Sequence, residues 1–286
     1  MTTAIGTRRQ RLNLPATIVL AVGMIYTILP VVWILIASTK TSGELFSTPA
    51  MVPSFGGGFA KNLHELFTYG NGIFLEWARN SVIYAVGGGV LSTVIAAAAG
   101  YALGKYQFRG STLIFRVIVA GIMLPAVALA IPQWLLLSRV SLTNNYLSVI
   151  LPVLVSPYAI YLCKIYAEAS IAPELIEAAR IDGASEWRIF HAVGLRLMFP
   201  ALVTVFLLQF IGIWNNFLLP SIMLSNPHLY PLTMGLSGML RVSGGQAALY
   251  STVIMGSLVA IIPVVILFLA LQRFWKIDLI SGGVKS

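Results

Sequence analysis

A polar stretch interrupts an otherwise apolar sequence: Glu177-Ala-Ala-Arg-Ile-Asp182-Gly183-Ala184-Ser-Glu-Trp-Arg-Ile-Phe190. Pro173 fits the first turn of a helix, because the N–H that proline lacks has no partner there. Gly183 predicts the end of this helix, since glycine readily adopts the left-handed conformation of helix C-termini. Ser185 then fits the N-cap of a second short helix, and Pro200 fits the start of an apolar one. The stretch therefore predicts two short surface helices joined by a glycine turn.

Six apolar segments lie around this stretch, at 14–37, 81–104, 113–136, 146–166, 200–223 and 249–271. At a rise of about 1.5 Å per residue, each covers the roughly 30 Å hydrocarbon core of a bilayer. The 286 residues are 58% hydrophobic and only 9% charged, as in a polytopic membrane protein. We expect an all-α bundle of six transmembrane helices over residues 14–272. A helical loop at 167–199 and tails at 1–13 and 273–286 complete this division.

The net charge of +9 predicts an orientation in the membrane rather than binding to nucleic acid, because lysine and arginine mark the cytoplasmic side. With both termini inside, thirteen of the 18 basic residues lie in cytoplasmic segments and five in external ones. The opposite orientation would reverse this bias. We therefore expect both termini and the loop at 167–199 in the cytoplasm.

Charged residues are nearly absent from the span interiors, which argues against a carrier coupled to protons or sodium. The neutral polar and aromatic candidates there are Gln133, Ser156, Tyr158, Gln209, Trp214, Asn215 and Asn216. Such groups suit a path for an uncharged, hydroxyl-rich solute such as a sugar, and hydrogen bonding between helices is the alternative. The candidate pore-lining residues are Gln209, Trp214, Asn215 and Asn216, because adjacent amides in one span need partners.

Several other site classes find no support in the sequence. The single Cys163 excludes an internal disulfide, and the three histidines are too scattered for a metal site. Residues 100–106 resemble a phosphate-binding loop, but too few residues separate the two glycines. The spans carry no evident catalytic acid, nucleophile or metal site, so an intramembrane enzyme is disfavoured. We expect no catalytic, cofactor or metal site in this chain.

The polar stretch resembles the signature loop of binding-protein-dependent ABC importer permeases. The matching residues are Glu177, Ala178, Ala179, Asp182, Gly183, Ala184, Phe190 and Pro200. The resemblance implies that the first helix of the loop docks into a cleft of a separate cytoplasmic ATPase and transmits its closure to the pore. The alternative is an amphipathic helix resting on lipid headgroups. The family usually has a proline where this chain has Arg196.

The resemblance extends along the chain from about residue 14 to its end. Asn80-Ser81, Trp214-Asn215 before Phe217, the run 230–236 and the tail from Gln272 look like carbohydrate-importer permeases, especially the second, maltose-type six-span subunit. Asn216 departs from this pattern, since the family often has an acidic residue there, and Ser286 stands where it often has glycine.

The family resemblance also implies partners and a location. These are a homologous permease, two ATPase subunits, an extracytoplasmic solute-binding protein, membrane lipid and a sugar, in a prokaryotic inner membrane. ATP and magnesium would be bound by the ATPase. A permease for another uncharged or phosphodiester solute, or a membrane scaffold that recruits an ATPase without transporting, are the alternative functions.

Overall fold

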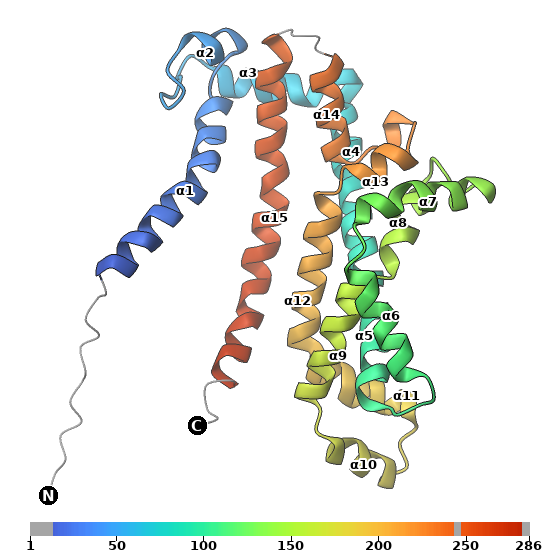
Figure 1. The fold of residues 1–286 in the computed structure, drawn as a ribbon. Coiled ribbons are helices and arrows are strands. Elements are labelled where there is room, and N and C mark those ends of the chain that lie inside the picture. Colours follow the sequence, from blue (N-terminus) through green and yellow to red (C-terminus); the bar gives the residue numbers. More distant parts are fainter. Residues whose placement is uncertain (1–13, 243–246, 282–286) are drawn as a thin grey trace, which may run out of the picture.

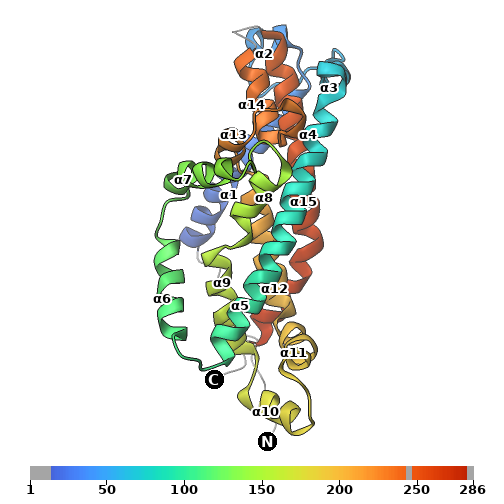
Figure 2. The ribbon, with the colours of Figure 1, turned by 90° about the vertical axis from the view of Figure 1, so that its right-hand side faces the viewer.

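The computed structural model describes residues 14–242 and 247–281, in which the regular secondary structure is helical and no strand is present. The helices are α1 (Leu14–Ser38), α2 (Ser42–Ser47), α3 (Gly58–Thr68), η1 (Tyr69–Gly72), α4 (Ile73–Val82), η2 (Ile83–Gly87), α5 (Gly88–Lys105), α6 (Ser111–Ile122), α7 (Ala126–Arg139), α8 (Tyr146–Leu154), α9 (Pro157–Ser170), α10 (Pro173–Ile181), α11 (Glu186–Ile189), η3 (Phe190–Gly194), α12 (Leu195–Trp214), α13 (Leu218–Met223), η4 (Pro227–Leu229), α14 (Leu232–Val242) and α15 (Ala247–Ser281). Helices α5, α9 and α12 form the centre of the bundle, and α10 and α11 form one of its ends (Figure 1, Figure 2).

Four helical stretches in the described part of the chain are long and apolar enough to cross a membrane, at Leu14–Ser38, Gly58–Lys105, Glu186–Trp214 and Leu249–Phe274. Two pairs of shorter helices meet the same test together, α6 with α7 and α8 with α9, and each pair is bent at a short break. The count reaches six if each pair is one span. The predicted all-α polytopic bundle is confirmed, and its six-span count agrees with this upper value.

The third predicted span, 113–136, is not one continuous helix. It divides into α6 and α7, whose axes meet at 107°, and α7 runs sideways out of the bundle (Figure 2). Pro125 stands directly before α7 with extended backbone angles. Proline has no N–H to donate and disfavours helical backbone in the residue before it, so the helix stops there. The fourth span bends by only 41° where Pro157 opens α9.

The fifth predicted span, 200–223, was shifted along the chain. The π-helical turn η3 joins α11 to α12, so Pro200 lies inside a helix that starts before it. Helix α12 then ends at Trp214, and Leu218–Met223 forms the separate helix α13. The predicted segment therefore covers two helices and the break between them.

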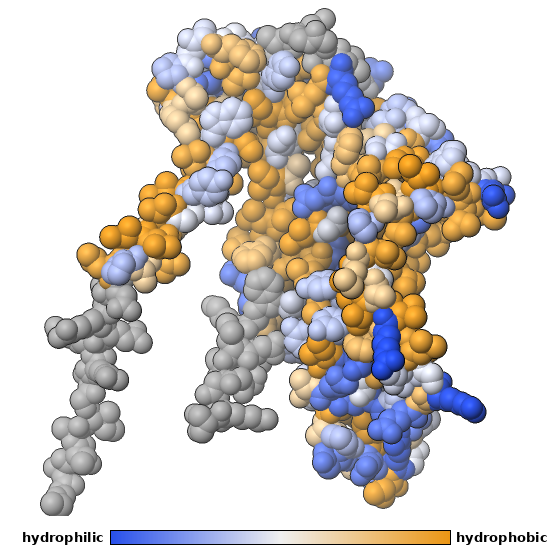
Figure 3. All heavy atoms as spheres, in the orientation of Figure 1, coloured by the Kyte–Doolittle hydropathy of each residue, from blue (hydrophilic) through white to orange (hydrophobic). Residues whose placement is uncertain are grey.

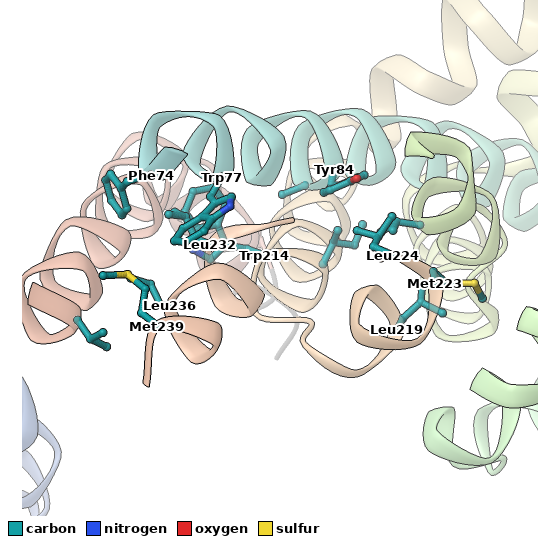
Figure 4. Close-up of a cluster of buried hydrophobic side chains, with 14 of the residues drawn as sticks. Phe74, Trp77, Tyr84, Trp214, Leu219, Met223, Leu224, Leu232, Leu236 and Met239 are labelled. Atoms are coloured by element: carbon teal, nitrogen blue, oxygen red, sulfur yellow. The ribbon is translucent and has the colours of Figure 1, made fainter. Parts of the chain in front are cut away.

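Close backbone contact joins α5 to α9. A Cβ atom added at Gly100 would lie 2.5 Å from Cys163 Cβ and 2.7 Å from the Cys163 carbonyl carbon, so only glycine fits. Small residues allow membrane helices to approach in this way. A core of buried side chains surrounds α4 and η2, and it includes Trp77 and Tyr84 together with Leu232 and Leu236 of α14 (Figure 4). The contact between α5 and α9 and this core hold the central helices in fixed positions.

Helix α1 stands apart from the rest of the bundle (Figure 1). Its buried residues are Ala37 and Ser38, at the end next to α2, whereas Tyr26 is 81% exposed and Leu20 is 73% exposed. Apolar side chains dominate the surfaces of α1 and of the central bundle in Figure 3. A surface of this kind is suited to contact with lipid or another membrane protein rather than with water.

Candidate coupling site and polar path

Helix α10 has the two ends that its sequence predicted. Pro173 occupies its first turn, directly after the extended Ala172. At the other end, Gly183 has a φ of +79°, and its N–H donates to Arg180 O at 3.0 Å. The Ala184 N–H donates to Ala179 O, also at 3.0 Å. These paired bonds around a left-handed glycine form a Schellman motif, which ends the helix and turns the chain toward α11.

One side of α10 is fastened to the bundle and the other is exposed. Ile176 is 5% exposed and lies in the core below α5 and α9, with Ala179 and Ala184 packed against it. In contrast, Glu177 and Ala178 are exposed and Ile181 is 86% exposed. The exposed side therefore offers apolar surface and carboxylate charge together at the tip of the molecule, where α10 lies in Figure 1.

Helix α11 begins at the predicted cap. The Ser185 hydroxyl accepts the Arg188 N–H, and the residues that follow continue through η3 into α12. Phe190 is 9% exposed, and its ring centroid is 5.1 Å from that of Tyr101 on α5. This predicted coupling residue thus anchors the loop from inside. Trp187, which is 71% exposed, is an apolar side chain on the outside of the same loop.

Gln209 lies between three helices. Its Nε2 donates to Ser156 Oγ at 3.1 Å, and its Oε1 accepts from Ser92 Oγ at 3.4 Å. The three residues belong to α12, to the N-cap of α9 and to α5. Hydrogen bonding between helices, the alternative considered for this amide, is therefore present. We call Ser92, Ser156 and Gln209 the polar triad.

The two adjacent amides predicted within the fifth span lie instead at its end. Asn215 follows the last residue of α12, and Asn216 Oδ1 accepts the Leu219 N–H at the start of α13. Asparagine favours such positions because its side chain bonds to nearby backbone groups. Trp214 is 4% exposed and stacks on Phe210, with ring centroids 5.4 Å apart.

A cavity of about 580 Å³ lies beside these residues, between the end of α12 and helices α14 and α15. Its lining includes Trp214 and Asn215 together with Thr233, Ser237 and Ser257. The structure therefore brings two of the four pore candidates to one cavity. Gln209 takes part in the polar triad instead.

Among the described residues, no group of three histidine, cysteine, aspartate or glutamate side chains could hold a metal ion. Cys163 is buried between α5 and α9, where it faces Gly100.

Comparison with known families decides the class of the protein. The family described as "Binding-protein-dependent transport system inner membrane component" matches residues 93–276, which is well over half of the chain. The chain belongs to this family. It is therefore a multi-pass membrane permease component and not an enzyme.

Two curated permeases and one solved structure illustrate the similarity. The chain is 37% identical to the "Arabinooligosaccharides transport system permease protein AraQ" of Halalkalibacterium halodurans, over 75% of this chain and 76% of the relative. It is 32% identical to the protein of the same description from Bacillus subtilis, over 90% of each chain. Its fold matches a chain in the "Crystal structure of a bacterial ABC transporter involved in the import of the acidic polysaccharide alginate", with a TM-score of 0.80 and 23% identity, covering 95% of this chain and 99% of that one.

Sequence reasoning missed one group of residues in this permease. Arg180 Nε lies 2.7 Å from Glu186 Oε1, and the Tyr106 hydroxyl donates to Glu186 Oε2 at 2.6 Å. Tyr106 is 80 positions before Glu186, so no local spacing indicates the contact. Only the charge of Arg180 and Glu186 within one loop hinted at it.

Proposed function

We propose that this permease component forms half of the translocation path of an ATP-driven sugar importer. The observation that supports the proposal most directly is α10, a helix that is capped at its C-terminus, held to the bundle by Ile176 and exposed on its other side. A docking element needs this combination, because the partner must find apolar surface and its push must reach the membrane helices. A helix resting on lipid would not need the connection to the bundle.

The ATPase docking site in this proposal comprises Glu177, Ala178, Ala179, Asp182, Gly183 and Ala184, with Phe190 as its inner anchor. The small side chains of Ala178 and Ala179 allow close approach by another protein. Glu177 and Asp182 carry negative charge toward a basic rim of the partner. Exposed Ile181 supplies the apolar contact that such interfaces place near their centre.

The proposed complex contains this chain, a homologous permease, two ATPase subunits and an extracytoplasmic solute-binding protein. The exposed apolar side of α1 suits packing against the second permease. ATP and magnesium would be bound by the ATPase subunits, and this chain would contribute no cofactor site. The complex would lie in the inner membrane of a prokaryotic cell, in contact with its lipid.

The orientation follows from the basic residues. Helix α5 ends at Lys105, and α6 begins after Arg109, both at the α10 end of the bundle, whereas α2 and α3 lie at the opposite end with Lys40 and Lys61 (Figure 1). More lysine and arginine residues lie in the segments at the α10 end than in those at the opposite end, so we place the α10 end on the cytoplasmic side. The start of α1 and the last turn of α15 also lie toward this end (Figure 1), so both termini would be cytoplasmic.

A sugar is the solute we propose, because the two relatives above are described as permeases for arabinooligosaccharides. The cavity at the end of α12 supports this choice, since Trp214 offers an aromatic face and Asn215, Thr233 and Ser237 offer neutral hydrogen-bonding groups. An anionic solute such as a phosphodiester would favour basic groups along the path. The lining residues of this cavity include none.

Affinity purification of the tagged chain from its native membrane tests the proposal. Mass spectrometry is expected to recover one homologous permease and an ATPase with the wild-type chain. Ile181→Glu places a charge in the proposed interface and should lower the recovery of ATPase. Phe55→Glu is the matched control, because Phe55 is 94% exposed near the opposite end. Equal recovery with both variants would contradict docking through α10.

Uptake measurements separate the remaining alternatives. Membrane vesicles that contain the purified complex should accumulate labelled arabino-oligosaccharide when ATP is supplied inside and the binding protein outside. Competition by a phosphodiester rather than by sugars would identify the other solute class. An ATPase that is recovered with the chain but drives no uptake of either solute would indicate a scaffold.

A further inference from the structure

The loop that carries α10 is tied to the membrane bundle at two neighbouring residues. On the entry side, Lys105 Nζ donates to Ile171 O at 2.5 Å, just before α10. On the exit side, the Tyr106 hydroxyl donates to Glu186 Oε2 at 2.6 Å, just after α10. Lys105 and Tyr106 are consecutive residues at the C-terminal end of α5. One point of the bundle therefore holds both sides of the loop.

Glu186 also reaches α10 itself. Its Oε1 lies 2.7 Å from Nε of Arg180, in the last turn of α10, and the Arg180 guanidinium lies over the Tyr106 ring at 5.9 Å. The Arg180 and Glu186 side chains are 45% and 52% exposed, so this ion pair contributes little to stability. Its effect is geometric, because a carboxylate held by two donors fixes the distance between α10 and the end of α5.

The covalent joints of α10 are less suited to this role. Ile171 and Ala172 are extended, and Gly183 is left-handed, so no helix continues from α10 into α9 or α11. Rotations at such residues absorb movement instead of passing it on. The contacts at Lys105 and Tyr106 bypass these joints.

Aromatic packing beneath the loop holds the Tyr106 ring in place. The Tyr106 ring meets Tyr101 edge to face at a centroid distance of 5.6 Å, and Tyr101 in turn packs on Phe190 at 5.1 Å. A Cβ atom at Gly194 would lie 3.0 Å from the Tyr101 ring, so little space remains for independent movement. Burial and the bond to Glu186 both raise the pKa of Tyr106, so its hydroxyl remains a donor at neutral pH.

Helix α5 leads from this point to the polar triad. Ser92 and Lys105 lie on the same uninterrupted helix, and a rise of about 1.5 Å per residue places them roughly 20 Å apart. Ser92 contacts Gln209 of α12, which contacts Ser156 at the start of α9. A displacement of the α5 end therefore acts on three central helices.

We infer that the end of α5 is where movement of α10 enters the membrane bundle, with Tyr106, Glu186 and Lys105 as the positioning residues. This inference rests on the proposed function, since it assumes an ATPase that moves α10. Tyr106→Phe removes only the hydroxyl and keeps the aromatic packing. Tyr230→Phe is the matched control, because that hydroxyl donates to Ser225 O away from the α10 loop.

The experiment measures movement in the purified complex without knowledge of the solute. Spin labels are attached at Arg109→Cys, three residues beyond Tyr106, and at Leu269→Cys on α15, which is 55% exposed. The native Cys163 is fully buried and should not react with the label. The distance between the labels is measured before and after ATP with vanadate.

We expect the labelled wild-type and Tyr230→Phe complexes to change this distance on addition of ATP with vanadate. Tyr106→Phe should reduce the change to roughly half or less, while the ATPase stays bound and still hydrolyses ATP. Glu186→Gln, which keeps an acceptor but no charge, should give an intermediate change. These results together support the positioning role.

Three results would overturn the inference. An unchanged distance response in both Tyr106→Phe and Glu186→Gln means that α5 is not held through these groups. No response in the wild-type complex, with ATPase bound, means that the α5 end does not move. Failure to recover any ATPase with the wild-type chain refutes the proposed function itself, and the inference falls with it.

Discussion

Gly183 allows the coupling loop to be tested through backbone strain alone. Its φ is +79°, and a Cβ atom built there would meet nothing within 4 Å. The Cβ atom of Gly183→Val therefore meets no clash, and the expected effect is the cost of a left-handed backbone, which is about 1–2 kcal/mol and greater for β-branched residues. If the residue leaves this conformation, the bonds from Gly183 to Arg180 and from Ala184 to Ala179 are lost.

This strain acts on a loop whose two short helices bury few side chains. Ile176 is the buried residue of α10, so the helix depends on its C-terminal cap. A strain of 1–2 kcal/mol can lower the fraction of loops with the docking geometry by up to about 5–30-fold. We expect recovery of the ATPase with the tagged Gly183→Val chain to fall within that range, as measured by quantitative mass spectrometry. Gly183→Asn should retain most binding, because asparagine tolerates the left-handed region.

Gly110 provides the control. Its φ is +93°, its Cβ position is also open, and it lies before α6, outside the α10 loop. Gly110→Val introduces a similar strain, so any general loss of folding should appear in both variants. If both valine variants lose the ATPase equally, or if Gly183→Val loses none, the proposed role of the glycine turn is refuted.

Three further predictions concern stability and pH. Gly100→Ala should destabilise the chain by about 1–3 kcal/mol in detergent-based thermal unfolding, because its Cβ would overlap Cys163, whereas Gly87→Ala meets open space and should be near neutral. Asn80→Ala should destabilise by about 2–4 kcal/mol, because this buried amide donates to two carbonyls and accepts a tyrosine hydroxyl; unfolding at the wild-type temperature would contradict this. Hydrogen bonds from Thr41 and Ser54 lower the pKa of the Glu44 carboxyl below 4.5. The stability that these bonds contribute is therefore present above that pH and is lost as the pH falls through the lowered pKa. A carboxyl NMR titration of Glu44 with an unshifted midpoint would refute this prediction.

The sequence predicted those features of the α10 loop that depend on interactions between residues close together in the chain. Pro173, Gly183 and Ser185 act on backbone groups within a few residues of themselves, so their roles can be read from spacing alone. The same holds for Pro125 and Pro157, which stand at the breaks in the third and fourth segments. A proline accounts for a break in each segment, but it does not determine the bend of 107° or 41°, because neighbouring helices set the angle.

Contacts between distant residues could not be predicted in this way. The bond from Tyr106 to Glu186 depends on how α5 and the α10 loop come together, and no periodicity relates the two positions. The end of α12 is an intermediate case. Two adjacent asparagines were placed inside the fifth span, but asparagine prefers helix ends, and the structure has both residues just after α12. Hydropathy alone extended the fifth span too far because the apolar run continues into α13.

Gln209 has more hydrogen-bonding capacity than its contacts between helices use. A glutamine amide has two N–H donors and an oxygen with two lone pairs. The contacts with Ser156 and Ser92 use one donor and one lone pair. One N–H and one lone pair of the amide are not used by these two links between α5, α9 and α12. The bond from Ser92 to Gln209 is the longer of the two contacts, at 3.4 Å. If α5 shifts when α10 moves, breaking this bond costs less energy than breaking the bond from Gln209 to Ser156. The polar triad is therefore suited to rearrange when the end of α5 is displaced.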